Sequence, residues 1–264
     1  MNTLNKLLWV FFLALVINTS YAASSSCVEK TAGDVYNPIL QGDGTVIRFK
    51  KSEAPVDPDG NIFPLIILEQ ECDAEIETQF AELPYLGDPG KVDSAFLVDS
   101  DFDGKAELFV IHRVTLYSDT GIRYGSDYFT TLVYKRLDSQ RYERNERISA
   151  YFGEGGDVLS SSTSDKLIYD YPYKSEAAIK SRLASAQYKA WFEQAPITTR
   201  VLHKTYLNDH ANIAEKTSKY LIAGDEVLVL DQKSGWLEIV FHNEKKGDIK
   251  GWIQCKDTLE CAGR

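Results

Sequence analysis

The C-terminal part of the chain contains three short runs of β-branched and aromatic residues, at 219–230, 236–240 and 251–253. Glycine-containing turns separate them: Gly224-Asp225 opens the first strand, Ser234-Gly235 is a tight turn, and Gly247-Asp248 closes a longer hairpin. Apolar runs bounded by glycine-containing turns are typical of β-strands. Because strands this short bury an apolar face only by curling, the pattern predicts a small β-barrel over residues 198–264.

The same residues carry a family resemblance. The order Tyr-Leu-Ile-x-Gly-Asp at 220–225, Gly-Trp at 235–236 and Gly-Trp-Ile at 251–253 resembles a bacterial SH3-type domain. The resemblance implies an SH3-like barrel that binds a cell-wall component or a protein partner, and it implies no reaction. Trp236 and Trp252 are candidates for ligand-facing side chains, although tryptophan after glycine in such a barrel is more commonly part of the core.

The N-terminus predicts export. Lys6 precedes an apolar run at 7–17, and the small residues Ser20 and Ala22 follow it. This is the pattern of a secretory signal peptide at 1–22, cleaved after Ala22. The apolar run is too short to span a bilayer, and no other segment approaches that length. We therefore expect a soluble periplasmic or secreted protein. The alternative, a lipoprotein anchored through Cys27, lacks the leucine-like residue expected three positions before the cysteine.

The net charge of the chain favours some classes of binding partner over others. The 264-residue chain has a formal net charge of −10. Removal of residues 1–22 takes away Lys6 and no acidic residue, so the mature charge is −10 − 1 = −11. This balance disfavours nucleic acid or an anionic membrane and suits a basic protein or a cation.

Four cysteines remain after export, and an even number in an oxidising compartment predicts two disulfides. Of the three connectivities, the local one, Cys27–Cys72 and Cys255–Cys261, is the most economical. The chain-entropy relation assigns these pairs at most about 4 and about 2.4 kcal/mol. A Cys72 thiolate acting with His112 is the alternative, and it would leave Cys27 unpaired.

Residues 23–173 predict a β-rich domain. Turn clusters at 41–44, 57–61 and 87–90 separate strand-like segments at 45–49, 63–68, 94–98, 108–114 and 128–134. The expected fold is an antiparallel β-sandwich or a propeller-like arrangement, followed by the SH3-like barrel.

A helical connector is expected at 174–197. Ser175 can cap a helix there, and Ile179 and Leu183 recur on one face together with Ala186 and Ala190. Pro196 stops the pattern.

The strongest chemical motif is an acidic loop at residues 99–107, which lies between two predicted strands. Its carboxylates are Asp99, Asp101, Asp103 and Glu107, at loop positions 1, 3, 5 and 9. Gly104 permits the sharp turn, and the Lys105 carbonyl can add a backbone oxygen. Because only oxygen ligands are offered, the loop predicts calcium in a structural role. The alternative is an acidic turn without an ion, closed by side-chain hydrogen bonds.

The acidic loop resembles the calcium loops of FG-GAP-type repeats, with Glu107 in place of the last aspartate. With the segment at 142–149, it also resembles periplasmic calcium-loop proteins of the lysozyme-inhibitor and immunity type. That resemblance implies a chain that blocks a cell-wall hydrolase, and the acidic chain suits such a partner because many of these enzymes are basic. No motif position identifies the blocking residues.

The sequence contains no nucleophile elbow and no His-Glu-x-x-His zinc signature. We therefore expect a non-enzymatic binding protein of the bacterial cell envelope, whose partner is peptidoglycan or a periplasmic protein. One alternative within this class is an inhibitor or immunity protein against a wall hydrolase. A wall-active glycosidase that uses two carboxylates also stays open, because such pairs leave no sequence signature.

Overall fold

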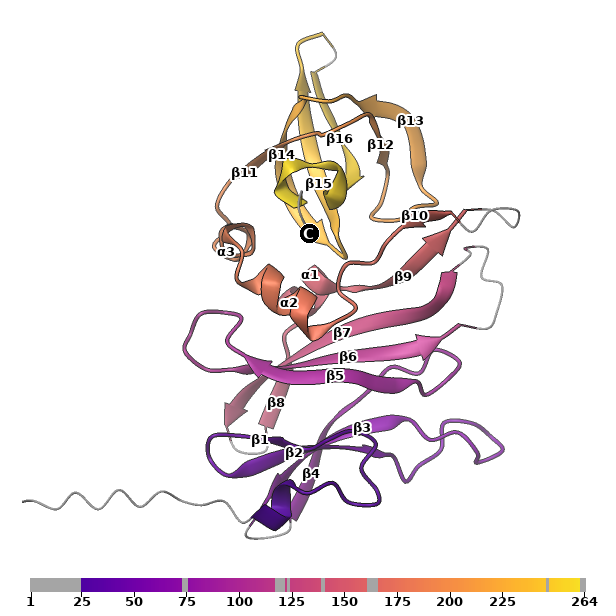
Figure 1. Ribbon diagram of the computed structural model, residues 1–264, viewed down its shortest axis with the longest axis vertical. Coiled ribbons are helices and arrows are strands. Elements are labelled where there is room, and N and C mark those ends of the chain that lie inside the picture. The colour runs from indigo at the N-terminus through magenta and orange to yellow at the C-terminus, as the bar shows by residue number, and fades with distance from the viewer. Residues whose placement is uncertain are drawn as a thin grey trace, which may run out of the picture.

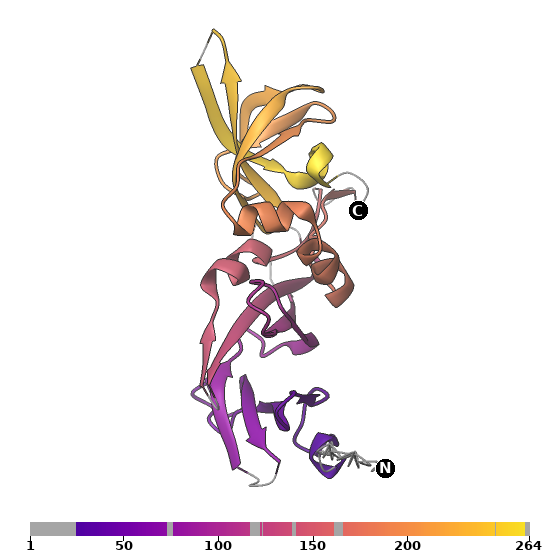
Figure 2. The same cartoon turned by 90° about the vertical axis from the view of Figure 1, so that its left-hand side faces the viewer.

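The computed structural model describes residues 25–72, 76–116, 122, 124–138, 141–160, 166–245 and 247–261. The expected signal peptide at 1–22 lies outside the described residues. Three antiparallel sheets follow one another along the long axis of an elongated molecule (Figures 1 and 2). The predicted mainly β fold class is confirmed.

The N-terminal sheet has four strands in the order β1-β2-β3-β4. Their bounds are Ile39–Leu40 for β1, Thr45–Lys51 for β2, Leu65–Glu71 for β3 and Ile76–Glu82 for β4. A short 3-10 turn at Ser25–Val28 precedes this sheet.

The central sheet has six strands, in the order β10-β9-β7-β6-β5, with β8 also paired to β7. The 15-residue length of β7 lets one edge pair with β6 while the other edge pairs with β8 and β9. The bounds are Lys91–Val98 for β5, Glu107–Thr115 for β6, Tyr124–Asp138 for β7, Arg141–Arg144 for β8, Glu154–Leu159 for β9 and Leu167–Tyr169 for β10.

Strand β6 lies between two cores. Its alternate residues Leu108 and Val110 face the N-terminal sheet, where they join Ile47 and Ile67. Phe109 points to the opposite face of the strand and belongs to a second, mostly aromatic core. Because successive strand residues point to opposite faces, a strand buried on both sides reads as a continuous apolar run. The N-terminal and central sheets therefore form a β-sandwich, and the propeller-like alternative is not found among the described residues.

Three short helices cover the second face of the central sheet: α1 (Glu146–Phe152), α2 (Glu176–Leu183) and α3 (Ala186–Phe192) (Figure 1). The prediction of one connector helix was wrong, because Ser185 leaves the helix and caps α3 by accepting from the Tyr188 amide. An unbroken helix would place Tyr188 opposite Ile179, since nine residues at about 100° each amount to half a turn beyond two turns. The break allows Ile179 and Tyr188 to be buried in the same core.

The C-terminal sheet has the strand order β11-β14-β15-β16-β12-β13 and surrounds its own apolar core. The Ser234-Gly235 turn joins β14 to β15 with φ angles of 52° and 80°, as a two-residue hairpin requires. The bounds are Ile197–Arg200 for β11, Thr205–Asn208 for β12, Lys216–Leu221 for β13, Glu226–Lys233 for β14, Trp236–Asn243 for β15 and Gly247–Gln254 for β16.

The expected closure of this sheet into a barrel is not found in the described residues, where the strand path begins at β11 and ends at β13. Two C-terminal 3-10 turns, Cys255–Asp257 and Leu259–Cys261, cover the outer side of β11 instead. The Glu260 amide donates to Thr199 Oγ1 at 3.1 Å, and the Leu202 amide, just past β11, donates to the Asp257 carbonyl at 2.9 Å. These bonds take the place of a closing strand.

Both predicted disulfides are present. Cys27 pairs with Cys72 and Cys255 with Cys261, at Cα–Cα separations of 5.5 and 5.4 Å. Cys72 is therefore not a free thiol, which removes the alternative of a nucleophile acting with His112. Disulfides of this kind are compatible with an extracellular or periplasmic compartment.

The C-terminal sheet contributes to the aromatic core of the central sheet: Trp236 is a buried member of that core, and Trp252 packs against it. Trp236 is 2% exposed and stacks on Tyr169 with ring centroids 5.6 Å apart. The Pro172 ring also lies close to the backbone of the C-terminal sheet here, since a Cβ at Gly235 would lie 2.6 Å from Pro172 Cγ. The interpretation of Trp236 as ligand-facing was therefore wrong, because the residue is part of the core. Trp252 is partly exposed.

Candidate functional site

The acidic loop joins β5 to β6, and the pairing of Val98 with Glu107 closes it. Gly104 has a φ of 85°, in the left-handed region that glycine adopts freely. Phe102 also has a positive φ, 63°, and its ring packs 5.6 Å from that of Phe192 on α3. The loop is therefore a tight hairpin connection held against the helices.

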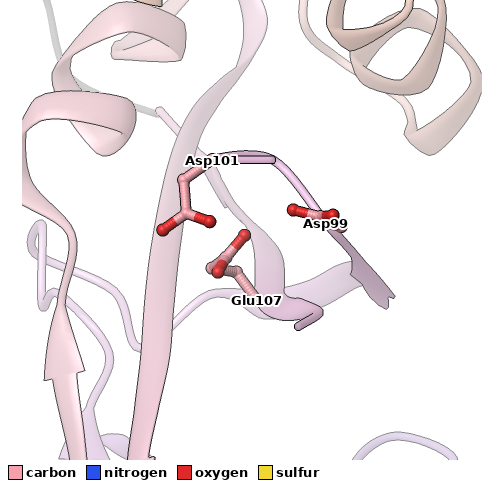
Figure 3. A group of neighbouring side chains, drawn as sticks. All are labelled: Asp99, Asp101 and Glu107. Atoms are coloured by element: carbon pink, nitrogen blue, oxygen red, sulfur yellow. The ribbon is translucent and has the colours of Figure 1, made fainter. Parts of the chain in front are cut away.

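Three of the predicted ligands converge. Oxygen atoms of Asp99, Asp101 and Glu107 lie within 4.8 Å of one another, and Figure 3 shows their carboxylates facing a common space. Asp103 does not belong to this group. The backbone amide of Lys105 donates a hydrogen bond to Asp103 Oδ1 at 2.8 Å.

Backbone amides of the loop already bond to the carboxylates. The Gly104 amide donates to Asp99 Oδ2 at 3.0 Å, and the Asp103 amide donates to Asp101 Oδ1 at 3.2 Å. These are the side-chain hydrogen bonds that an acidic turn uses with or without an ion. They position the carboxylates but do not identify what the group holds.

Sequence reasoning missed Lys135, which lies on β7 next to the loop. Its Nζ donates to Asp103 Oδ2 at 2.7 Å and also to Asp101. This ammonium group lowers the pKa of Asp103, and the two carboxylates raise the pKa of Lys135. The loop itself contains no signal for this contact, since only the pairing of β6 with β7 brings Lys135 near. One cation therefore offsets part of the charge of four carboxylates.

Glu107 is the buried member of the group, at 1% exposure. Its Oε2 accepts hydrogen bonds from the amide and the hydroxyl of Ser100, at 2.8 and 2.7 Å. Burial raises the pKa of Glu107 above its ordinary value, and the two bonds from Ser100 act against that rise. Within the described residues, Glu107 Oε1 and Asp99 Oδ1 are buried without a hydrogen-bond partner.

Two unpartnered buried carboxylate oxygens within one small group are costly unless a cation or a donor satisfies them. Asp99, Asp101 and Glu107 therefore fit a hard cation that prefers oxygen ligands. Helix α3 is hydrogen-bonded to the loop, since the Tyr188 hydroxyl donates to the Ser100 carbonyl at 2.8 Å. Burial raises the pKa of Tyr188, so this hydroxyl keeps its proton at neutral pH.

A second surface lies on β12 and β13, and sequence reasoning missed it. Tyr206 and Tyr220 are directly paired across these strands, with ring centroids 6.0 Å apart. Lys204 Nζ lies 4.1 Å from the Tyr220 ring centroid, and Lys216 Nζ lies 3.9 Å from that of Tyr206. Tyr220 is 53% exposed. We call these four residues the tyrosine–lysine face.

The tyrosine–lysine face stands out in an acidic chain because it is locally basic and aromatic. The sequence signal was Lys216 and Tyr220 four residues apart on one strand, which places both on the same face. This signal alone could not identify the face, because Tyr206 lies on a separate strand, β12, and Lys204 directly precedes that strand.

In the part of the chain that the structure describes, no helix has both the length and the apolar character needed to cross a membrane. A scan against protein-family models, a search of curated proteins and a search of solved structures each found no match to this chain.

Proposed function

We propose that this chain is an exported, non-enzymatic binding protein of the bacterial cell envelope. In this proposal the C-terminal, SH3-like sheet binds peptidoglycan, and a calcium ion in the acidic loop stabilises the central sheet. The tyrosine–lysine face is the observation that supports wall binding.

The chemistry of this face suits a peptidoglycan strand. The exposed Tyr220 ring and the half-buried Tyr206 ring offer apolar surface against which sugar rings can pack, and burying such surface contributes about 25 cal/mol per Å². Lys204 and Lys216 are held over the rings and can pair with the carboxylates of stem peptides. The negative charge of the rest of the chain works against non-specific binding to anionic polymers.

Co-sedimentation with purified peptidoglycan sacculi, with calcium present, tests this proposal. We expect the mature protein to pellet with the sacculi, and Tyr220→Ser to weaken the binding by about two- to ten-fold, as the loss of some tens of Å² of buried apolar surface predicts. Tyr85→Ser is the matched control, because Tyr85 is also exposed, at 38%, but lies in the N-terminal half of the chain. We expect this control to pellet like the wild type.

Protein that stays in the supernatant would overturn wall binding. A protein partner, such as a basic wall hydrolase to be inhibited, would then be the function to pursue, with residual hydrolase activity as the readout. Release of soluble fragments from the sacculi by the protein alone would overturn the non-enzymatic assignment.

The calcium part of the proposal is supported by the unpartnered oxygens of Asp99 and Glu107. If the affinity is about 0.1–1 mM, as in extracellular modules, about 10 mM calcium should raise the free energy of unfolding by about 1.4–2.7 kcal/mol. Urea denaturation with calcium and with chelator measures this increment. We expect Glu107→Gln to abolish most of it, because the buried ligand loses its charge.

Two further variants sharpen this test. Asp59→Asn changes an exposed aspartate in another turn and should leave the calcium increment unchanged. Lys135→Gln should lower stability in chelator and enlarge the calcium increment, because Asp101 and Asp103 then lack their ammonium partner. An equal stability in calcium and chelator for the wild type would instead leave the acidic turn without an ion as the correct interpretation.

A further inference from the structure

A cavity of about 420 Å³ lies where the central and C-terminal parts of the molecule meet. Three segments that are distant in sequence form its wall: residues 169–173, helix α2, and the C-terminal residues from Gln254 to the Cys255–Cys261 disulfide. The volume falls within the range of small-molecule sites, which commonly lie at such junctions. The cavity contains no residue of the acidic loop or of the tyrosine–lysine face.

The buried wall is largely apolar. Tyr169, Pro172, Ala178 and the disulfide supply most of it. The Tyr169 hydroxyl is already used, since it donates to the Ser234 carbonyl. The Tyr173 hydroxyl accepts from Gln232 Nε2 at 3.0 Å. These tyrosines therefore present ring surface to the cavity, and their hydroxyl groups are held elsewhere.

Gln254 is the exception in this wall. Its side chain lines the cavity, its Oε1 is buried, and the described residues offer that oxygen no hydrogen-bond partner. A buried amide oxygen without a partner costs about 1–3 kcal/mol. An N–H group brought by a ligand would recover that cost, and the rest of the Gln254 amide could donate in return.

Among the described residues, the charged groups of this wall lie at its exposed rim. Asp170 is held by Lys174 Nζ at 2.6 Å, so its charge is already balanced, and Lys256 is exposed to solvent. Of the residues that the structure describes, the buried part of the wall contains no ionisable group other than the two tyrosines. A charged ligand would therefore lose hydration without gaining a buried partner.

From the apolar wall and the unpartnered Gln254 amide, we propose that this cavity binds a small uncharged molecule with an aromatic or aliphatic body and one amide group. The amide pairs with Gln254, and the body packs against Tyr169, Pro172 and the disulfide. This inference goes beyond the proposed function and does not depend on it.

N-benzylacetamide and benzyl acetate make a matched pair of probes, because the ester keeps the shape and the carbonyl but lacks the N–H donor. Titration of the ¹⁵N-labelled, disulfide-intact protein followed by NMR measures both affinities. We expect N-benzylacetamide to bind saturably and to shift the Gln254 side-chain resonances. We expect benzyl acetate to bind about five-fold more weakly, as the loss of one hydrogen bond predicts.

Three variants localise the binding. Ala178→Phe fills the cavity and should abolish binding of both probes, whereas Ala177→Phe places the same ring on the exposed neighbouring position of α2 and should change neither. Gln254→Leu should reduce N-benzylacetamide to the affinity of benzyl acetate. Its fold should persist, because no hydrogen bond to that side chain is lost.

Two results would overturn the inference. Equal binding by the Ala178→Phe and Ala177→Phe proteins would place the probes outside the cavity. Equal affinities of the wild type for the amide and the ester would exclude recognition by Gln254. Failure of sacculus binding would affect neither result, so this inference and the proposed function fail independently.

Discussion

Replacement of Trp236 by alanine is expected to lower the free energy of unfolding by about 3–5 kcal/mol. Trp236 belongs to the C-terminal sheet, yet it is 2% exposed in the core of the central sheet and stacks on Tyr169. Truncation would leave a cavity at the junction and loosen the attachment of the C-terminal sheet. Urea denaturation of the disulfide-intact protein, followed by circular dichroism, measures the loss.

Trp252→Ala is the control for this change. Trp252 also follows a glycine, but it is only partly buried, so a smaller loss is expected. The two variants also separate a core role from a binding role. If Trp236→Ala abolished sacculus binding while the free energy of unfolding stayed within about 0.5 kcal/mol of wild type, Trp236 would be a ligand contact after all.

Replacement of Gly90 by alanine is expected to cost about 2–5 kcal/mol. Gly90 has a φ of 65°, and the left-handed conformation costs a non-glycine residue about 1–2 kcal/mol. In addition, a Cβ here would lie 2.5 Å from the Arg113 carbonyl oxygen and 2.5 Å from His112 Nε2. His112 is fully buried and its Nε2 is 2.8 Å from the Pro89 carbonyl oxygen, so neither neighbour can move freely. Overpacking of this kind typically adds about 1–3 kcal/mol.

Gly87→Ala separates the two contributions. Gly87 lies in the same turn with a φ of 84°, but a Cβ there would have no atom within 4 Å. It should therefore lose only the conformational part, about 1–2 kcal/mol. Equal losses in the two variants, measured by urea denaturation, would show that the close approach of β6 to Gly90 does not matter for stability.

Local features of the chain were predictable because their causes are local. The β-branched runs and the glycine turns predicted most long strands, and the Ser234-Gly235 hairpin has the backbone angles that such a turn requires. Economy of loop closure predicted both disulfides. Carboxylate spacing predicted that Asp99, Asp101 and Glu107 would converge.

Some elements escaped prediction because propensity alone works against them. Two of the six residues of β9 are glycines, which are poor strand formers. A Cβ at Gly155 would lie 2.9 Å from the Tyr171 ring, so packing against Tyr171 requires glycine at this position. The same glycine lowers the strand propensity from which β9 would have been predicted. Helix α1 is only seven residues long and depends on packing against the aromatic core, as marginal helices generally do.

The sequence by itself determined the mainly β class, the strand boundaries at glycine turns, the cysteine pairing and the acidic loop, because each arises from residues that are close in the chain or from simple chain entropy. Only the tertiary structure decided that Lys135 neutralises part of that loop, that Trp236 is core, and that Gln254 lines a cavity. Each of these depends on the packing of separate strands or segments against one another, and side-chain periodicity within one segment contains no information about its partner.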